Sequence, residues 1–238
     1  MRKGGFTLIE CLLGLTLSLL IITTGFEFFA RAEKAFARLK EREETGQAAL
    51  AALDRMRIDL LHAGRGLSPE IGLGLVEAAA ATDDELRTVS LEKELTLASP
   101  ARAGDTRISV ASTADVTSGQ RIALREDTAG EVRTIARVEA GAVLIDAPLE
   151  RGYAPAAAVL SLLEVVTYFL DEPAGILRRR VNTSPAQPLL EGVAAAAWSL
   201  DTASLLVRIR LEPETEGAHP HEATVFLKNP ALARNSGT

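Results

Sequence analysis

Cysteine, aromatic residues and net positive charge are what this sequence of 238 residues has least of. Its single cysteine, Cys11, excludes an intrachain disulfide and any zinc site built from cysteines. Acidic residues number 32 against 26 lysines and arginines, which gives a net charge of −6. An acidic chain without a basic stripe argues against a nucleic-acid partner. The one basic cluster, Arg178–Arg180, is interpreted as a solvated strand edge.

The sequence also lacks a catalytic or metal-binding pattern. No phosphate-binding glycine loop, G-x-S-x-G motif or paired-carboxylate pattern stands out. His62 lies near the end of an expected helix, and His219 and His221 flank Pro220 in a segment rich in Glu, Pro and Gly. No regular spacing joins these histidines to carboxylates, so we expect no metal, no cofactor and no enzymatic activity.

What the sequence does have is a long apolar run at its N-terminus. A short basic leader, residues 1–5, precedes it, and the segment from Phe6 to Phe29 is predicted to cross a membrane. As a helix, the stretch Phe6–Phe26 would be about 30 Å long, which matches the hydrocarbon core of a bilayer. Arg2 and Lys3 favour a cytoplasmic N-terminus, so the rest of the chain is expected on the opposite side.

Glu10 is the one charged residue inside this run. A carboxylate at mid-bilayer costs about 2–3 kcal/mol on insertion scales, and less near an interface. If the chain were cut after Gly5, the new amine of Phe6 could pair with Glu10, most easily between neighbouring subunits. The alternative is that Glu10 lies at headgroup depth and pairs with nothing. Because Glu10 directly precedes Cys11, where a lipoprotein signal needs a small residue, a lipid anchor is excluded.

The string Gly5-Phe6-Thr7-Leu8-Ile9-Glu10 resembles the processing motif of type IV prepilins and type II secretion pseudopilins. The resemblance implies that a prepilin peptidase cuts between Gly5 and Phe6 and methylates the Phe6 amine. It also implies that Glu10 pairs with the Phe6 amine of an adjacent subunit. Two other interpretations are a signal peptide cut after Ala30-Arg31-Ala32, for which the apolar run is too long, and a plain single-span anchor.

The helix is expected to continue beyond the membrane, because Glu27 to Ala63 contains no proline and is rich in helix formers. Gly64 and Gly66 are predicted to end it, before Pro69. An apolar stripe packed on the chain's own sheet is favoured over a dimeric coiled coil. The stripe is expected at Leu39, Gly46, Ala49, Leu53, Met56, Leu60 and Ala63.

Beyond residue 69 the pattern changes to short β-strands separated by glycine turns. The expected fold is α+β, with a long N-terminal helix on an antiparallel sheet and a small β-rich insert of barrel or sandwich type. The predicted divisions are 1–5 leader, 6–29 membrane helix, 30–66 amphipathic helix, 67–97 loop and first strands, 98–158 insert, and 159–238 sheet. The predicted strands are Leu86–Leu91, Leu95–Leu97, Arg107–Val110, Arg121–Leu124, Val132–Val138, Ala142–Ile145, Leu162–Asp171, Gly175–Val181, Pro188–Val193 leading to Trp198, Leu205–Leu211 and Ala223–Leu227.

The order of several short strings resembles the PilW-type minor pilins, and the secretion pseudopilin GspJ shares much of the pattern. The strings are Ala63-Gly64, Val166–Leu170, Leu177–Arg179, Leu189–Val193 and Val225–Asn229. The resemblance implies a minor pilin that primes pilus assembly or forms the tip. The implied partners are prepilin peptidase, other minor and major pilins, the inner-membrane assembly platform and membrane lipid. A pseudopilin is the alternative within this class, and a periplasmic binding domain on a single-span anchor is the alternative outside it.

Overall fold

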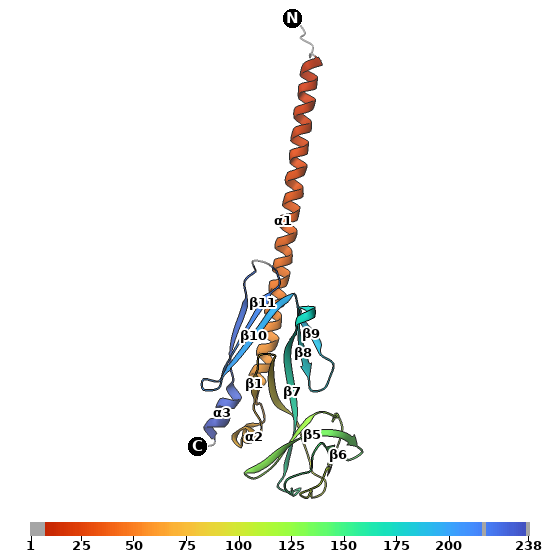
Figure 1. Cartoon of the computed structure of the whole chain (residues 1–238), viewed down its shortest axis with the longest axis vertical. Coiled ribbons are helices and arrows are strands. Elements are labelled where there is room, and N and C mark those ends of the chain that lie inside the picture. Colours follow the sequence, from red (N-terminus) through yellow and green to blue (C-terminus); the bar gives the residue numbers. More distant parts are fainter. Residues whose placement is uncertain (1–7, 216–217, 237–238) are drawn as a thin grey trace. The chain divides into compact units, whose positions relative to one another are not determined.

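The computed structural model describes residues 8–215 and 218–236, which form an α+β fold (Figure 1). The chain divides into two compact units at Gln47–Ala48, and we call the second unit, from Ala48 onward, the head. The elements are α1 (Leu8–His62), α2 (Ser68–Gly72), β1 (Ala79–Ala81), β2 (Glu85–Leu95), β3 (Arg107–Ser109), β4 (Arg121–Glu126), β5 (Ala129–Glu139), β6 (Ala142–Ile145), β7 (Val159–Asp171), the 3-10 turn η1 (Glu172–Ala174), β8 (Ile176–Val181), β9 (Gln187–Glu191), β10 (Val193–Asp201), β11 (Leu206–Pro213), β12 (His221–Phe226) and α3 (Lys228–Ser236).

Helix α1 runs for 55 residues without a break and ends where the glycines predict. Gly64 and Gly66 both have φ of +75°, a backbone conformation that residues with a side chain rarely adopt. At Gly64 an added Cβ would lie 2.8 Å from Cδ1 of Ile71, so the turn into α2 also has no room for a side chain. The predicted end of the helix is confirmed.

The apolar stripe is buried only within the head. Ala49, Leu53, Met56 and Leu60 have at most 6% of their surface exposed and belong to the main hydrophobic core. Leu39, which the seven-residue spacing places on the same stripe, is 63% exposed. The predicted stripe is therefore correct from Ala49 onward and wrong at Leu39, because a seven-residue apolar repeat identifies one face of a helix but does not show that the face is buried.

Strand β7 is the central strand of a nine-stranded antiparallel sheet. One of its edges pairs with β2. The other edge pairs first with β4, from Val159 to Leu163, and then with β8, from Val166 to Asp171. The C-terminal part of β7 therefore carries β8 and β9, which pack beside α1. The N-terminal part of β7 pairs with β4, and the sheet continues from β4 to β5, β6 and β3. The last four strands make up the β-rich insert, and β7 holds both parts in one sheet.

Strands β10, β11 and β12 form a second, three-stranded sheet. Val207, Ile209 and Leu211 of β11 alternate with exposed or half-buried residues and are at most 1% exposed, as the period of two predicts. The structure corrects one expectation, since the strands after residue 159 belong to two sheets and not to one. Alternation identifies which face of a strand is buried, but it does not identify the neighbouring strand.

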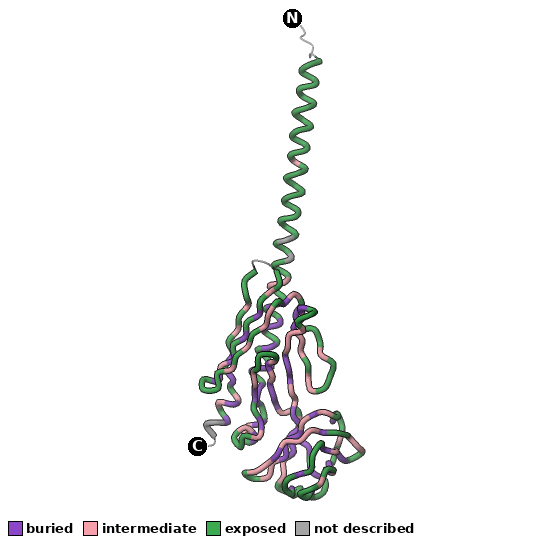
Figure 2. The backbone as a smooth tube through the Cα atoms, in the orientation of Figure 1, coloured by how far each residue is buried: buried purple, intermediate pink, exposed green. Residues whose placement is uncertain are grey.

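Three hydrophobic clusters lie inside the head. Figure 2 shows the buried residues along its strands. The largest joins the C-terminal turns of α1 to β2, β7, β8, β11 and β12. The second fills the insert and includes Ile108, Ile122, Ile135 and Leu160, all at 0% exposure. A small third cluster contains Leu67, Ala123 and Leu163. The second cluster also contains Leu95 of β2 and Leu162 of β7, so the core of the insert is shared with these two strands.

Candidate functional site: the N-terminal helix and its junction with the head

The predicted processing site precedes the part of the chain that the structure describes. Gly5 and Phe6 lie outside the described residues, so the cleavage and methylation there stay predictions. Glu10 lies in the first turn of α1, and its side chain is exposed. Glu10 is therefore part of α1 in the described residues, and its pairing with the Phe6 amine of another subunit stays a prediction.

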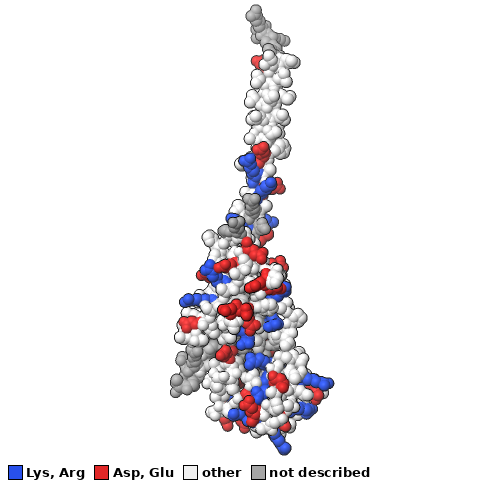
Figure 3. Space-filling model, viewed as in Figure 1, with Lys and Arg blue, Asp and Glu red and all other residues white. Residues whose placement is uncertain are grey.

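The first half of α1 presents an apolar surface on every side. An 18-residue window in this helix has a mean hydropathy of 2.0 and none of it is buried, and α1 is the one helix in the described residues that could cross a membrane by length and composition. Figure 3 shows this part of the helix almost free of charged side chains. A helix that is apolar all round belongs in a protein core or in a bilayer. In the described residues none of this window is buried.

Hydroxyl groups in this apolar segment are bonded within the helix. Thr16, Ser18 and Thr23 each donate a hydrogen bond to the carbonyl four residues earlier, at 3.0, 2.8 and 3.0 Å. A hydroxyl without a partner is costly in hydrocarbon, and this backbone bond removes most of that cost. These three polar residues are therefore compatible with a membrane-spanning helix.

Charged residues begin again at Glu27. Glu27 pairs with Arg31 at 3.5 Å, and Lys40 pairs with Glu44 at 3.8 Å, each one helical turn apart and well exposed. Exposed pairs of this kind add about 0.3–0.5 kcal/mol each to a helix. They mark the point at which α1 changes from an apolar helix to one suited to water.

A buried carboxylate joins α1 to the nine-stranded sheet. Asp59 is 8% exposed, and it accepts hydrogen bonds from the Tyr168 hydroxyl of β7 and from Nε of Arg179 of β8, the latter at 2.7 Å. Arg55 adds an ion pair at 3.4 Å from one turn earlier in the helix. Burial, and then the hydrogen bond to Asp59, raise the pKa of Tyr168, so the hydroxyl stays protonated and donates. This cluster fixes the position of the helix against the sheet.

One feature of the sequence, the position of Asp59, could have predicted this cluster. Asp59 lies on the buried face of α1, between Met56 and Leu60, where a carboxylate requires a buried partner. The partner is Arg179, so the interpretation of Arg178–Arg180 as a solvated strand edge is wrong. Strand β8 pairs on both sides, with β7 and β9, and the Arg179 side chain is only 17% exposed.

A second buried carboxylate, Glu70, joins the short helix α2 to the insert. One of its oxygens accepts from the Ser161 hydroxyl of β7 at 3.1 Å and from Nε of Arg125 of β4 at 3.4 Å. Glu70 is 1% exposed. The contact ties the chain just after α1 to the point where the insert leaves β7.

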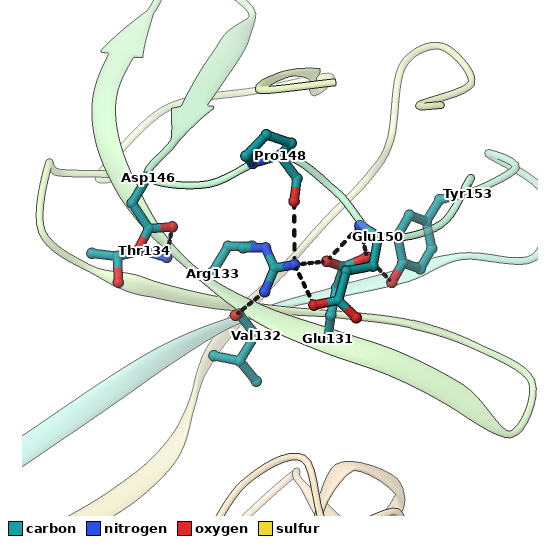
Figure 4. Close-up of polar contacts among 8 residues, drawn as sticks. All are labelled: Glu131, Val132, Arg133, Thr134, Asp146, Pro148, Glu150 and Tyr153. Carbon is teal, nitrogen blue, oxygen red and sulfur yellow. Dashed lines mark hydrogen bonds and ion pairs between the residues drawn. The ribbon is translucent and has the colours of Figure 1, made fainter. Parts of the chain in front are cut away.

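A third buried carboxylate lies within the insert, as Figure 4 shows. Glu131 accepts hydrogen bonds from the Tyr153 hydroxyl at 2.9 Å and from the backbone N–H of Glu150 at 3.1 Å. Arg133 pairs with Glu131 and Glu150 and donates to the carbonyl of Pro148 at 3.2 Å. Burial and the bond to Glu131 raise the pKa of Tyr153. The arginine holds two carboxylates and a carbonyl together, and so fastens the segment after β6 to β5.

The histidines do not come together. His62 is exposed in the last turn of α1, His219 is exposed, and His221 begins β12. Within residues 8–215 and 218–236, no group of three or more His, Cys, Asp or Glu side chains is arranged to hold a metal ion. The buried carboxylates described above are bonded to arginine, tyrosine and serine side chains from other elements of the fold.

No protein-family model and no curated protein matches the chain. Two phage tailspikes among solved structures match in part. The Gp54 tailspike of Acinetobacter baumannii bacteriophage AP22, in complex with A. baumannii capsular saccharide, is 16% identical over 32% of this chain, with a TM-score of 0.29. The tailspike protein gp49 from Pseudomonas phage LKA1 is 22% identical over 31% of this chain, with a TM-score of 0.27. The match spans 15% of each tailspike, and these similarities are too low to support an inference.

Proposed function

We propose that this chain is a minor pilin of a type IV pilus, a structural subunit and not an enzyme. The observation that carries the proposal is the position of the Gly5-Phe6 to Glu10 string. The string runs into a single helix, α1, which is apolar and exposed in its first part, becomes charged at Glu27 and continues into a β-rich head. A long N-terminal helix and an antiparallel head are what the resemblance to pilins implies.

In this function the first half of α1 has two successive environments. Before assembly it spans the inner membrane, with the leader in the cytoplasm and the head in the periplasm. After prepilin peptidase has removed residues 1–5, the same surface packs among the helices of other minor and major pilins, with the help of the inner-membrane assembly platform. A surface that is apolar all round suits both environments, because lipid and a helix bundle both exclude water.

Glu10 has a defined role in that transfer. Its carboxylate pairs with the methylated amine of Phe6 on an adjacent subunit, so two charges leave the membrane as a neutral pair. A buried charge that loses its partner is costly, by about 3–5 kcal/mol, so a subunit out of register is rejected. This requirement would direct the order of assembly.

The test is mass spectrometry of the N-terminus of the full chain expressed in a bacterium that has a prepilin peptidase. The expected product begins at Phe6 and carries one methyl group on its amine. An intact Met1, or a start near Glu33 from signal-peptide cleavage, would overturn the proposal.

Two matched variants make this test specific. Gly5→Leu should leave the leader in place, because a side chain there obstructs the extended backbone in the peptidase cleft. Gly4→Leu, one residue earlier, should still be processed. Glu10→Gln should be cut normally but should enter the fibre poorly. If Gly5→Leu is cut as well as Gly4→Leu, the assignment of the site is wrong.

A further inference from the structure

Three neighbouring strands of the nine-stranded sheet place two arginines and a threonine in one row, which we call the arginine row. Thr167 of β7 pairs directly with Arg87 of β2 on one side and with Arg180 of β8 on the other. Residues that pair directly lie on the same face of a sheet. The next residue of β7, Tyr168, faces α1 through its bond to Asp59. The arginine row therefore lies on the opposite face of the sheet, away from α1.

Arg121 of β4 adds a third guanidinium group to this face. It pairs with Leu163, which lies four residues before Thr167 on β7 and so on the same face. Arg121 is half-buried. Burial, and then the positive charge of Arg87, lower the pKa of Arg121, so these two guanidinium groups are close enough to repel each other. Like charges on neighbouring strands are destabilising, and burial of an unpaired charge adds to the cost.

Little negative charge opposes the three arginines. In the part of the chain that the structure describes, the guanidinium groups of Arg121 and Arg180 have no carboxylate partner. Arg87 has a long ion pair with Glu85, at 4.0 Å, in which the two side chains are 40% and 36% exposed. Arg180 lies over the ring of Phe169, with its Cζ atom 5.6 Å from the ring centre, and this contact leaves its charge in place. The face therefore has a local excess of positive charge.

Thr167 supplies a free hydrogen-bonding group between the two arginines of the row. It is only 5% exposed, yet its hydroxyl has no hydrogen-bond partner among the described residues. A buried hydroxyl is normally bonded, because its burial without a partner is costly. Adjacent strands lie about 4.8 Å apart, so Arg87 and Arg180 are about 10 Å apart at the backbone. Both side chains can therefore reach a small group placed above Thr167.

We propose that the arginine row, together with Arg121, binds the terminal phosphate group of a small soluble compound. The planar guanidinium of arginine donates two parallel hydrogen bonds, which suits a phosphate. A terminal phosphate carries about 1.5 to 2 negative charges and three acceptor oxygens, so it can offset the repulsion among the three arginines. A carboxylate or a phosphodiester carries a single charge and offsets less of it. The four residues lie in the head, so this site does not depend on the pilin assignment.

Isothermal titration calorimetry of the full chain in uncharged detergent micelles tests the proposal. The ligands are inorganic phosphate and glycerol 3-phosphate, and both should bind at a single site per chain. Dimethyl phosphate is a singly charged diester, like the phosphates of lipid headgroups and nucleic acids, and should bind at least about tenfold more weakly. Absence of binding by both terminal phosphates, or equal affinity for dimethyl phosphate, would overturn the proposal.

Three variants separate binding from folding. Arg121→Gln should lower the phosphate affinity about tenfold, because a charge-assisted hydrogen bond is lost. Without phosphate it should not lower the melting temperature, because it removes a repulsion. Thr167→Val removes the hydroxyl and should weaken binding about fivefold. Arg208→Gln is the control, since it removes an exposed arginine of the second sheet.

The control fixes how the losses are interpreted. In about 0.1 M salt, exposed charges more than about 10 Å away are largely screened, so Arg208→Gln should change the affinity less than about twofold. Equal losses in Arg208→Gln and Arg121→Gln would show a general effect of charge and overturn the site. A lower melting temperature of Arg121→Gln with unchanged affinity would give Arg121 a structural role, and would overturn the site as well.

Discussion

Replacing Asp59 by alanine tests whether the junction between α1 and the nine-stranded sheet depends on its buried carboxylate. The substitution leaves the Arg179 guanidinium and the Tyr168 hydroxyl without their acceptor. Removing one partner of a buried charge pair costs about 3–5 kcal/mol. The Arg179 side chain is still 17% exposed and can reach water, so the lower end of that range, about 3 kcal/mol, is expected.

The assay is urea unfolding of the full chain in detergent micelles, followed by fluorescence. Trp198 is the only tryptophan, and it bridges the second sheet to the turn between β1 and β2. Its emission therefore reports on the head. With a urea dependence of about 2–3 kcal/mol per molar, a loss of 3 kcal/mol lowers the unfolding midpoint by about 1 M.

Two further variants set the scale of that loss. Asp54→Ala removes a carboxylate that is exposed one turn earlier on α1, and should change the free energy of unfolding by less than about 0.5 kcal/mol. Tyr168→Phe removes only the hydroxyl and should cost about 1–2 kcal/mol. Adding Tyr168→Phe to Asp59→Ala should cost less than the sum of the two, because they share a bond. An Asp59→Ala midpoint equal to that of Asp54→Ala would refute the reasoning.

Two other predictions concern pH and backbone conformation. The raised pKa of Tyr168 and of Tyr153 means that the stability these hydroxyls contribute is complete below the unfolded-state pKa of about 10 and is lost as pH rises above it. The melting temperature should therefore be constant from about pH 7 to 9 and fall above about pH 10. The fall should be less steep in Tyr168→Phe, which lacks one of the two hydroxyls. An equal fall in that variant would contradict the role given to the Tyr168 hydroxyl. Gly64→Ala should lower the melting temperature, because φ is +75° at this residue and Ile71 lies too close to an added Cβ. Gly46→Ala should not lower it, because Gly46 lies within α1 and nothing is near an added Cβ there. Equal effects of the two substitutions would show that the turn at Gly64 is not strained.

The sequence predicts which helices and strands form better than it predicts which of them lie side by side. The long helix, its end at Gly64 and the alternating strand at Leu206–Pro213 follow from local patterns. Strand β1 does not, because Ala79–Ala81 has little intrinsic preference for a strand and becomes one by pairing with β2. Helix α3 was missed because Pro230 interrupts a short segment; proline is tolerated there in the first turn.

In the candidate site, too, the sequence predicts local features but not the contacts between distant residues. The apolar half of α1 follows from the order of residues alone, as does the return of charge at Glu27. The partners of Asp59 do not, because Tyr168 and Arg179 are more than 100 residues away in the sequence and only the fold brings them to α1. A buried carboxylate predicts that a partner exists, but it does not predict which residue supplies it.

The three buried carboxylates have a common feature, which is their position at junctions between parts of the chain. Asp59 joins α1 to β7 and β8, Glu70 joins α2 to β4 and β7, and Glu131 joins β5 to the segment that follows β6. An apolar contact at these points would hold the parts together but would tolerate sliding, whereas a carboxylate needs its donors at fixed positions. If the proposed minor-pilin function holds, these contacts keep the C-terminal turns of α1 fixed to the head while the first half of the helix exchanges lipid for other subunits.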